Sequence, residues 1–317
     1  MGEMMQAPDQ VYSFYLTGAD DKSVPLVRGR LARLTDASAQ ILARHDYPDM
    51  AASLSAETMA LAGCLTSLLK FEGVFTLQAK GDGAIKTLFA DVTHEGHLRS
   101  YVAYDEDALA KIETHYPLVL PKMMGAGYMA FTVDQRLAGQ DSDSRYQGIV
   151  ELDGPHLADA ASAWFKNSEQ LASSVITASM KTADGWHSAA LMLQQIALEG
   201  GAEADLDDGY ADDIWHTAVT LMSSVKQDEL LDPALSGEAL INRLFHSVGA
   251  FVQPARQLSD TCRCSTKKVE NMLLGLAPDQ LQDMADEDGA LAVDCAFCKT
   301  SRVYSLGDVD ALRGAQG

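Results

Sequence analysis

The chain has 317 residues, enough for two or three folded units, and 47% of them are hydrophobic, so a sizeable core can be buried. Its 45 acidic and 24 basic side chains give a net charge of −21, which disfavours contact with phosphate backbones and anionic lipid and makes nucleic acid an unlikely partner. The first residues lack the pattern of a secretory signal, and no apolar run approaches the ~18 residues that span a bilayer. We therefore expect a cytoplasmic protein with no membrane partner.

The first two thirds of the sequence mix helical and strand patterns. Residues 36–70 carry apolar side chains at helical spacing. Val74–Lys80 and Ala84–Val92 flank a Gly-Asp-Gly turn and predict a hairpin, to which His97–Tyr104 can add a strand. Further predicted elements are strands at Tyr128–Val133 and Tyr146–Leu152, a helix at Asp159–Gln170, and strands at Ser173–Lys181 and Trp186–Gln194. This mixture, without βαβ alternation, predicts an α+β fold with a mixed, sandwich-like N-terminal domain.

The composition changes at residue 199. Glu199–Asp213 contains seven acidic residues and no basic one, which is typical of a solvated loop. Ile214–Val225 and Gly237–Phe245 predict helices, and the segment around Pro233 separates them. We interpret this region as a helical linker.

Four of the five cysteines lie in the last 56 residues. They form a Cys262-x-Cys264 hook and, after 30 intervening residues, a Cys295-x-x-Cys298 hook. Clustered cysteines in a reducing compartment indicate metal or redox chemistry, and four thiolates on two hooks satisfy the tetrahedral preference of zinc. The sequence therefore predicts one zinc ion with these four cysteine ligands.

The segment between the hooks predicts a compact unit. Ser265 can cap a helix that ends at Leu274, Pro278 can begin a second helix through Asp283, and Leu291–Val293 predicts a strand that leads to the second hook. About 60 residues are marginal for an independent core. We therefore expect folding of this unit to depend on the metal.

Other interpretations of the cysteines stay open at this point. A nucleic-acid-binding zinc ribbon normally carries two Cys-x-x-Cys hooks on a basic surface, whereas from Cys262 onward six basic residues face nine acidic ones. A purely structural zinc site is the interpretation that spacing alone favours. A thioredoxin-like hook needs a βαβ unit, which the pattern around Cys295 lacks.

Such a site offers chemistry for a switch. Vicinal thiols can pair on oxidation, Cys262 with Cys264 and Cys295 with Cys298, and the metal then loses its ligands and its contribution to folding. The fifth cysteine, Cys64, lies in an apolar helical pattern and is predicted to be buried and inert. No catalytic constellation is recognisable, so we do not expect an enzyme.

The chain resembles, over nearly its whole length, the bacterial redox-regulated thirty-three-kilodalton heat-shock chaperone family. The most specific match is Cys262-Arg263-Cys264-Ser265 together with Cys295-x-x-Cys298. The other matching segments are Val27-Arg28-Gly29, Leu69-Lys70-Phe71-Glu72-Gly73, Gly81-x-Gly83, Leu98-Arg99-Ser100-Tyr101, Tyr146-Gln147-Gly148-Ile149-Val150, Ser168-Glu169-Gln170, Leu193-Gln194-Gln195 and Arg243-Leu244-Phe245-His246.

The resemblance implies three parts: an α+β core domain over 1–198, a helical linker over 199–255 and a C-terminal zinc and redox-switch domain over 256–317. It implies an ATP-independent holdase that is inactive while reduced and zinc-bound. Oxidation would form two disulfides, release zinc, unfold the C-terminal region and loosen the linker, and homodimers would then hold unfolded client proteins under oxidative and heat stress. The family usually has an aromatic residue where this chain has Arg302. The alternative function is a constitutive zinc-stabilised protein that binds other proteins, nucleic acid or ribosomes.

Overall fold

The computed structural model describes residues 9–18, 24–68, 71–112, 119–135, 144–197 and 209–315. The chain divides into two compact units, Met1–Asp260 and Thr261–Gly317, each with its own core. The fold is α+β, as the sequence predicts. Among the described residues, no helix combines the length and apolar character that crossing a membrane requires.

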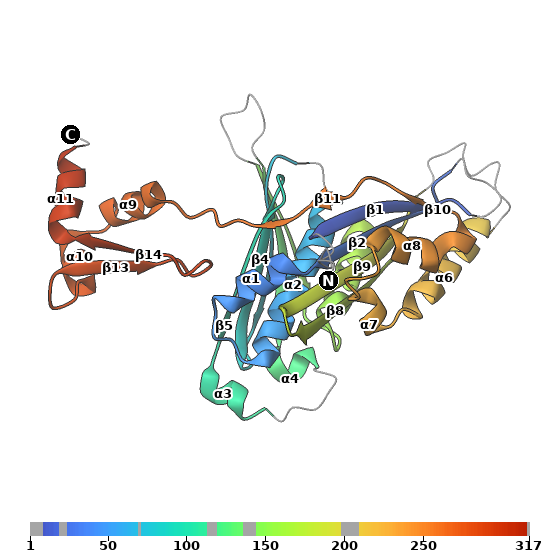
Figure 1. The fold of residues 1–317 in the computed structure, drawn as a ribbon, viewed down its shortest axis with the longest axis horizontal. Helices are drawn as coiled ribbons and strands as arrows, with labels where there is room; N and C mark the ends of the chain where they lie inside the picture. The colour runs from blue at the N-terminus through green and yellow to red at the C-terminus, as the bar shows by residue number, and fades with distance from the viewer. Residues whose placement is uncertain are drawn as a thin grey trace, which may run out of the picture. The chain divides into compact units, whose positions relative to one another are not determined.

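Two six-stranded sheets form the frame of the larger unit (Figure 1). The first, which we call sheet A, has the order β10-β1-β2-β9-β8, and β11 also pairs with β1. Its strands are β1 (Gln10–Leu16), β2 (Val27–Leu34), β8 (Ser173–Thr182), β9 (Gly185–Gln195), β10 (Ala250–Val252) and β11 (Arg256–Gln257). The second, sheet B, has the order β12-β5-β4-β3-β6-β7. Its strands are β3 (Gly73–Gly81), β4 (Ile85–Thr93), β5 (His97–Tyr104), β6 (Gly127–Gln135), β7 (Ser144–Glu151) and β12 (Ser259–Asp260).

The helical pattern over 36–70 corresponds to two helices rather than one. They are α1 (Asp36–Ala43) and α2 (Asp49–Thr66), and the break falls at Pro48, the N-cap of α2. Most side chains of α2 are buried because the helix contacts strands of both sheets. Three further helices are α3 (Glu106–Ala110), α4 (Leu120–Met124) and α5 (Leu157–Trp164), the last continued by a π-helical turn over Phe165–Glu169.

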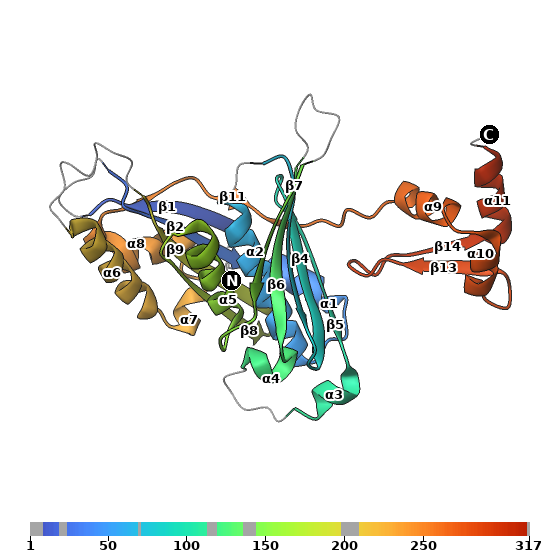
Figure 2. The ribbon, with the colours of Figure 1, turned by 180° about the vertical axis from the view of Figure 1, so that it is seen from behind.

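Sheet A separates two hydrophobic clusters, because alternate residues of a strand point to opposite faces. Ala32 and Leu34 on β2 face a cluster shared with α2 and sheet B, whereas Leu31 faces the other side. That other side is covered by α6 (Tyr210–Ser223), α7 (Gln227–Leu230) and α8 (Gly237–Phe245), which lie beside the strands of sheet A in Figures 1 and 2. At its centre the rings of Phe14 and Phe245 stack with centroids 5.4 Å apart.

The strands predicted between Val74 and Gln194 are confirmed, with ends shifted by at most two residues. Two differences remain. Strands β1 and β2 are absent from the prediction. The acidic stretch is not a loop throughout, since α6 begins at Tyr210 and places Asp212 and Asp213 in its first turn, where the helix dipole favours negative charge. The rest of that stretch, 199–208, lies outside the described residues.

The smaller unit contains three helices and one hairpin among its described residues. They are α9 (Thr266–Leu274), α10 (Pro278–Met284), β13 (Ala290–Asp294), β14 (Ser301–Ser305) and α11 (Leu306–Gly314). The predicted start of α10 at Pro278 is confirmed, whereas β14 and α11 were not predicted. Its fully buried apolar residues are few: Leu273, Leu281, Leu291 and Val309. A core this small leaves much of the unit's stability to another source.

Candidate metal centre

Local structure places each cysteine hook at the end of a regular element. The first hook directly precedes α9, and Ser265 is the N-cap of that helix, with its hydroxyl accepting a hydrogen bond from the Lys268 amide, as predicted. The second hook lies in the loop that joins β13 to β14. The Lys299 amide donates to the Cys295 carbonyl over 2.9 Å, and the Cys295 amide donates to the Thr300 carbonyl over 3.1 Å, which closes a tight turn around the two thiols.

The four thiols meet at one point. All four sulfur atoms lie within 4.8 Å of one another, Cys262 Sγ is 3.7 Å from Cys295 Sγ, and Cys264 Sγ is 3.4 Å from Cys298 Sγ. No disulfide joins them. A tetrahedron with metal–sulfur bonds of about 2.3 Å has sulfur–sulfur edges of about 3.8 Å, so the spacing fits one metal ion with four thiolate ligands. The structure therefore brings all four predicted site residues together.

The thiols differ in acidity. Burial, reinforced by neighbouring thiols, raises the pKa of Cys262 to about 12. Burial acts in the same direction on Cys298, but hydrogen bonding with the side chain and backbone of Thr300 and with the neighbouring thiols outweighs burial and lowers the pKa of Cys298 to about 6. The lowered pKa favours the thiolate form of Cys298, which is the form that binds a metal ion.

A positive side chain stands beside the cluster. Nη1 and Nη2 of Arg302 on β14 lie 3.8 and 3.7 Å from Cys264 Sγ. Four thiolates and one divalent ion carry a net charge of −2, which a guanidinium at this distance partly offsets. Arg302 thus contacts the thiol cluster through Cys264. The sequence pattern does not reveal this contact, because Arg302 and Cys264 are 38 residues apart and meet only in the folded unit.

Cys64, the fifth cysteine, is a buried thiol of the larger unit. It is fully buried in α2, its thiol donates to the Ala190 carbonyl over 3.1 Å, and burial raises its pKa to about 12. The prediction of a buried, inert thiol is confirmed in its burial.

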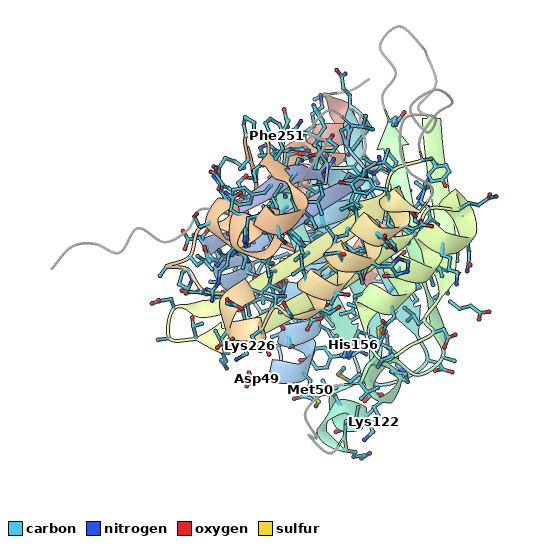
Figure 3. All side chains as sticks on the ribbon, turned by 90° about the vertical axis from the view of Figure 1, so that its right-hand side faces the viewer. Asp49, Met50, Lys122, His156, Lys226 and Phe251 are labelled. Carbon is cyan, nitrogen blue, oxygen red and sulfur yellow. The ribbon has the colours of Figure 1, made fainter. Side chains whose placement is uncertain are left out.

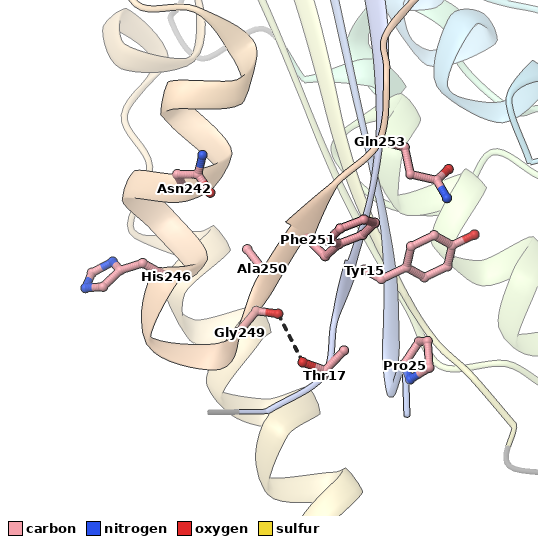
Figure 4. A pocket seen from close by; sticks show the side chains of 9 residues that line it. All are labelled: Tyr15, Thr17, Pro25, Asn242, His246, Gly249, Ala250, Phe251 and Gln253. Atoms are coloured by element: carbon pink, nitrogen blue, oxygen red, sulfur yellow. Dashed lines mark hydrogen bonds between the residues drawn. The ribbon is translucent and has the colours of Figure 1, made fainter. Parts of the chain in front are cut away.

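Two cavities lie between the helices α6–α8 and sheet A, one of them beside β10, the strand that follows α8. One, of about 280 Å³, is lined by Glu57, Ser179, His156 and Lys226, the last two labelled in Figure 3. The other, of about 800 Å³, lies beside β10 and is lined by Tyr15 and by Phe251, whose side chain is 63% exposed. Figure 4 shows how the Thr17 hydroxyl, just after β1, donates to the carbonyl of Gly249, which follows the 3-10 turn His246–Val248 after α8.

An α+β domain followed by a small unit with four converging thiols defines a two-unit protein with a candidate metal centre near its C-terminus. The chain belongs to the Hsp33 protein family, whose family model matches residues 9–305. A relative from Caulobacter vibrioides named 33 kDa chaperonin is 34% identical over 285 residues, covering 88% of this chain and 90% of that protein. Another of the same name from Azotobacter vinelandii is 34% identical over 293 residues, covering 92% of each chain.

The fold is also that of a solved relative. The crystal structure of the 33 kDa chaperonin from Thermotoga maritima matches with a TM-score of 0.76 and 21% identity, over 97% of this chain and 98% of that one. Family membership thus places the chain among chaperones, and the resemblance of its sequence to that family is confirmed.

Proposed function

We propose that this chain is a redox-regulated, ATP-independent holdase that is inactive while Cys262, Cys264, Cys295 and Cys298 hold one zinc ion. The observation that carries the proposal is the convergence of four free thiols in a unit with only a small core. A donor set of four sulfurs in tetrahedral spacing favours zinc over the hard cations, which prefer oxygen. A structural zinc ion contributes on the order of 10–16 kcal/mol to folding, so losing it removes the main support of the unit.

The proposed domain division gives the α6–α8 segment the role of the linker. These helices cover one face of sheet A with residues that include Leu240, Ile241 and Phe245, all of them buried. The strands β10, β11 and β12 then carry the chain from α8 to Asp260, two residues before the first cysteine. We infer that unfolding of the C-terminal unit loosens this segment, so that the helices detach and leave the apolar face of sheet A open to unfolded clients and to a second copy of the chain.

The proposed disulfides are Cys262–Cys264 and Cys295–Cys298. In the zinc-binding arrangement the hooks also approach each other, with Cys262 near Cys295 and Cys264 near Cys298. Those cross-hook pairs are separated by 33 and 34 residues, so once the unit unfolds they carry a larger loop-closure cost than pairs within one hook. Mapping the disulfides by mass spectrometry after oxidation distinguishes the two pairings.

The central experiment measures metal, thiols and activity on one sample. Zinc released to a chromogenic chelator, free thiols and suppression of client aggregation are followed after peroxide treatment at raised temperature, with the reduced protein as control. We expect zinc release and thiol loss to accompany the gain in protection. Oxidised, zinc-free protein that protects clients no better than the reduced form would refute the switch. The alternative, constitutive binding of nucleic acid or ribosomes, predicts a gel shift at low salt that oxidation does not change.

A further inference from the structure

Strand β7 (Ser144–Glu151) forms one edge of sheet B (Figure 2). On one side it pairs with β6 in an unbroken antiparallel register, and among the described residues no strand pairs with its other side. Trp164 of α5 lies against a face of β7, at the point where a Cβ added to Gly148 would meet the indole, and not along the edge. The backbone N–H and C=O groups along this edge are therefore a template for a further strand.

This edge lacks features that usually protect one. Native edge strands are commonly short, bulged, or interrupted by proline or lysine. Strands β12 and β10 have two and three residues, and β8 carries Lys181. Strand β7 has eight residues, SRYQGIVE, without proline, lysine or bulge. Its Tyr146 and Ile149 side chains are 52% and 60% exposed, so β7 is suited to pairing with another chain.

The sequence of β7 is complementary to itself. Two copies related by a two-fold axis perpendicular to the sheet pair antiparallel, and each residue then lies opposite a residue on the same face. With the axis at Gly148, Arg145 of each copy lies opposite Glu151 of the other, and Tyr146 lies opposite Val150. An axis at the residue before or after Gly148 places each charge opposite a neutral residue or beyond the end of the strand. The charges therefore select the pairing about Gly148.

The neighbouring strand extends this complementarity. Arg145 pairs with Asp134 of β6, with Nε 3.4 Å from Oδ1, whereas Glu151 lies opposite Tyr128 and makes no ion pair among the described residues. In the paired arrangement Glu151 gains Arg145 of the second copy, and Asp134, Arg145 and Glu151 form a row of alternating charge across three strands. The two-fold axis produces this row twice. Exposed charges of this kind contribute mainly to the choice of partner and register.

We propose that β7 is a contact surface for a second copy of this chain, which pairs with it antiparallel about Gly148 and joins two copies of sheet B into one continuous sheet. This surface is separate from the apolar face of sheet A. It is exposed while the four thiols are free and while α6–α8 cover sheet A. The contact therefore needs no oxidation and does not rest on the proposed holdase switch.

The first test is sedimentation velocity on full-length, reduced, zinc-loaded protein over a range of concentrations. We expect a monomer–dimer equilibrium with a Kd of about 100 μM or lower. Hydrogen exchange of the β7 amides should slow as the concentration rises through this Kd, because the edge groups become hydrogen-bonded. Protein that stays monomeric at about 1 mM, or a dimer whose β7 amides exchange as fast as those of the monomer, overturns the proposal.

Charge reversal tests the register. Arg145→Glu and Glu151→Arg each place like charges opposite one another and should weaken the dimer at least about tenfold, whereas the double variant should restore the wild-type Kd. The two positions are six residues apart on one strand, or about 20 Å, so restoration arises only between copies. An extended segment of another protein bound at this edge would not show such restoration.

Lys80→Glu is the matched control, because it makes the same change of charge as Arg145→Glu at an exposed position of β3, inside sheet B. Its Kd should equal that of the wild-type protein. Equal weakening in Lys80→Glu and Arg145→Glu, or a double variant that stays as weak as the single ones, overturns the proposal. The readout is association of the reduced protein and not client protection, so a negative result leaves the proposed holdase function untouched.

Discussion

Removal of the Phe245 ring tests whether the helices α6–α8 conceal the client-binding surface. Phe245 is fully buried at the end of α8 and stacks on Phe14 of sheet A. Phe245→Ala deletes this contact and leaves a cavity between helix and sheet. The thiols are in the other unit and stay untouched by the substitution.

The expected effect is large. Replacing a buried phenylalanine by alanine costs about 3–5 kcal/mol, because both transfer free energy and packing are lost. If that cost falls on the docked state of α8, the detached population rises roughly 100- to 4,000-fold. Reduced Phe245→Ala protein should therefore suppress client aggregation without any oxidant.

Light scattering of a thermally unfolding client measures the protection, while zinc and free thiols are counted on the same sample. Asn242→Ala is the matched control, since Asn242 is exposed on the same helix and its substitution should leave the reduced protein inactive. Hydrogen exchange of the α8 amides reports detachment directly. If exchange shows that α8 has opened while the zinc-loaded variant still fails to protect clients, clients do not bind to this face of sheet A.

Three further predictions concern the metal centre and one buried carboxyl. Cys264→Ser should weaken zinc affinity and make residues 261–317 sensitive to protease under reducing conditions, whereas resistance equal to wild type would contradict metal-dependent folding. Arg302→Met should lower zinc affinity about 10- to 100-fold in a chelator competition, as loss of a side chain that contacts a metal ligand generally does. Lys299→Met also removes one positive charge from this region and controls for net charge. Equal losses of zinc affinity in both variants would deny Arg302 a specific role. Burial raises the pKa of Glu57 although Thr177 and Ser179 donate hydrogen bonds to it, so the native state binds its proton more tightly than the unfolded chain and stability falls as pH rises through that raised pKa. Glu57→Gln should flatten this fall in denaturant titrations that start at the ordinary pKa of a glutamate and proceed to higher pH, and an unchanged slope would show that the carboxyl ionises freely.

The metal centre was readable from the sequence because its signal is local. Each hook is contained within three or four residues, and Ser265 and Pro278 mark the helices that position the first hook and the core. The role of Arg302 could not be predicted from such a local pattern. Its contact with Cys264 spans 38 residues of sequence, and no pattern along the chain encodes which residue of β14 faces the thiols.

Strand β2 shows why part of the frame was missed. Its sequence, VRGRLARL, places three arginines in a central strand, against the usual apolar pattern. Arg30 and Arg33 are nonetheless buried, because Arg30 donates to the Gly29 carbonyl and Arg33 to the carbonyls of Asp232 and Leu235 beyond α7. Tertiary acceptors far away in the sequence make the strand possible, and local propensity does not reveal them.

Sheet A lies between two separate hydrophobic clusters, so the helices on one face can detach in the proposed mechanism while the cluster on the other face stays packed. Val11, Ala32 and Met192 fix one face of the sheet to α2, and this packing involves none of the side chains that α8 contributes on the other face. Detaching the helices therefore removes one layer while the strands keep their ladder and their second core. In the proposed mechanism, the open protein would keep a template onto which the same helices can fold again, and exposure of the apolar face would be reversible without global refolding.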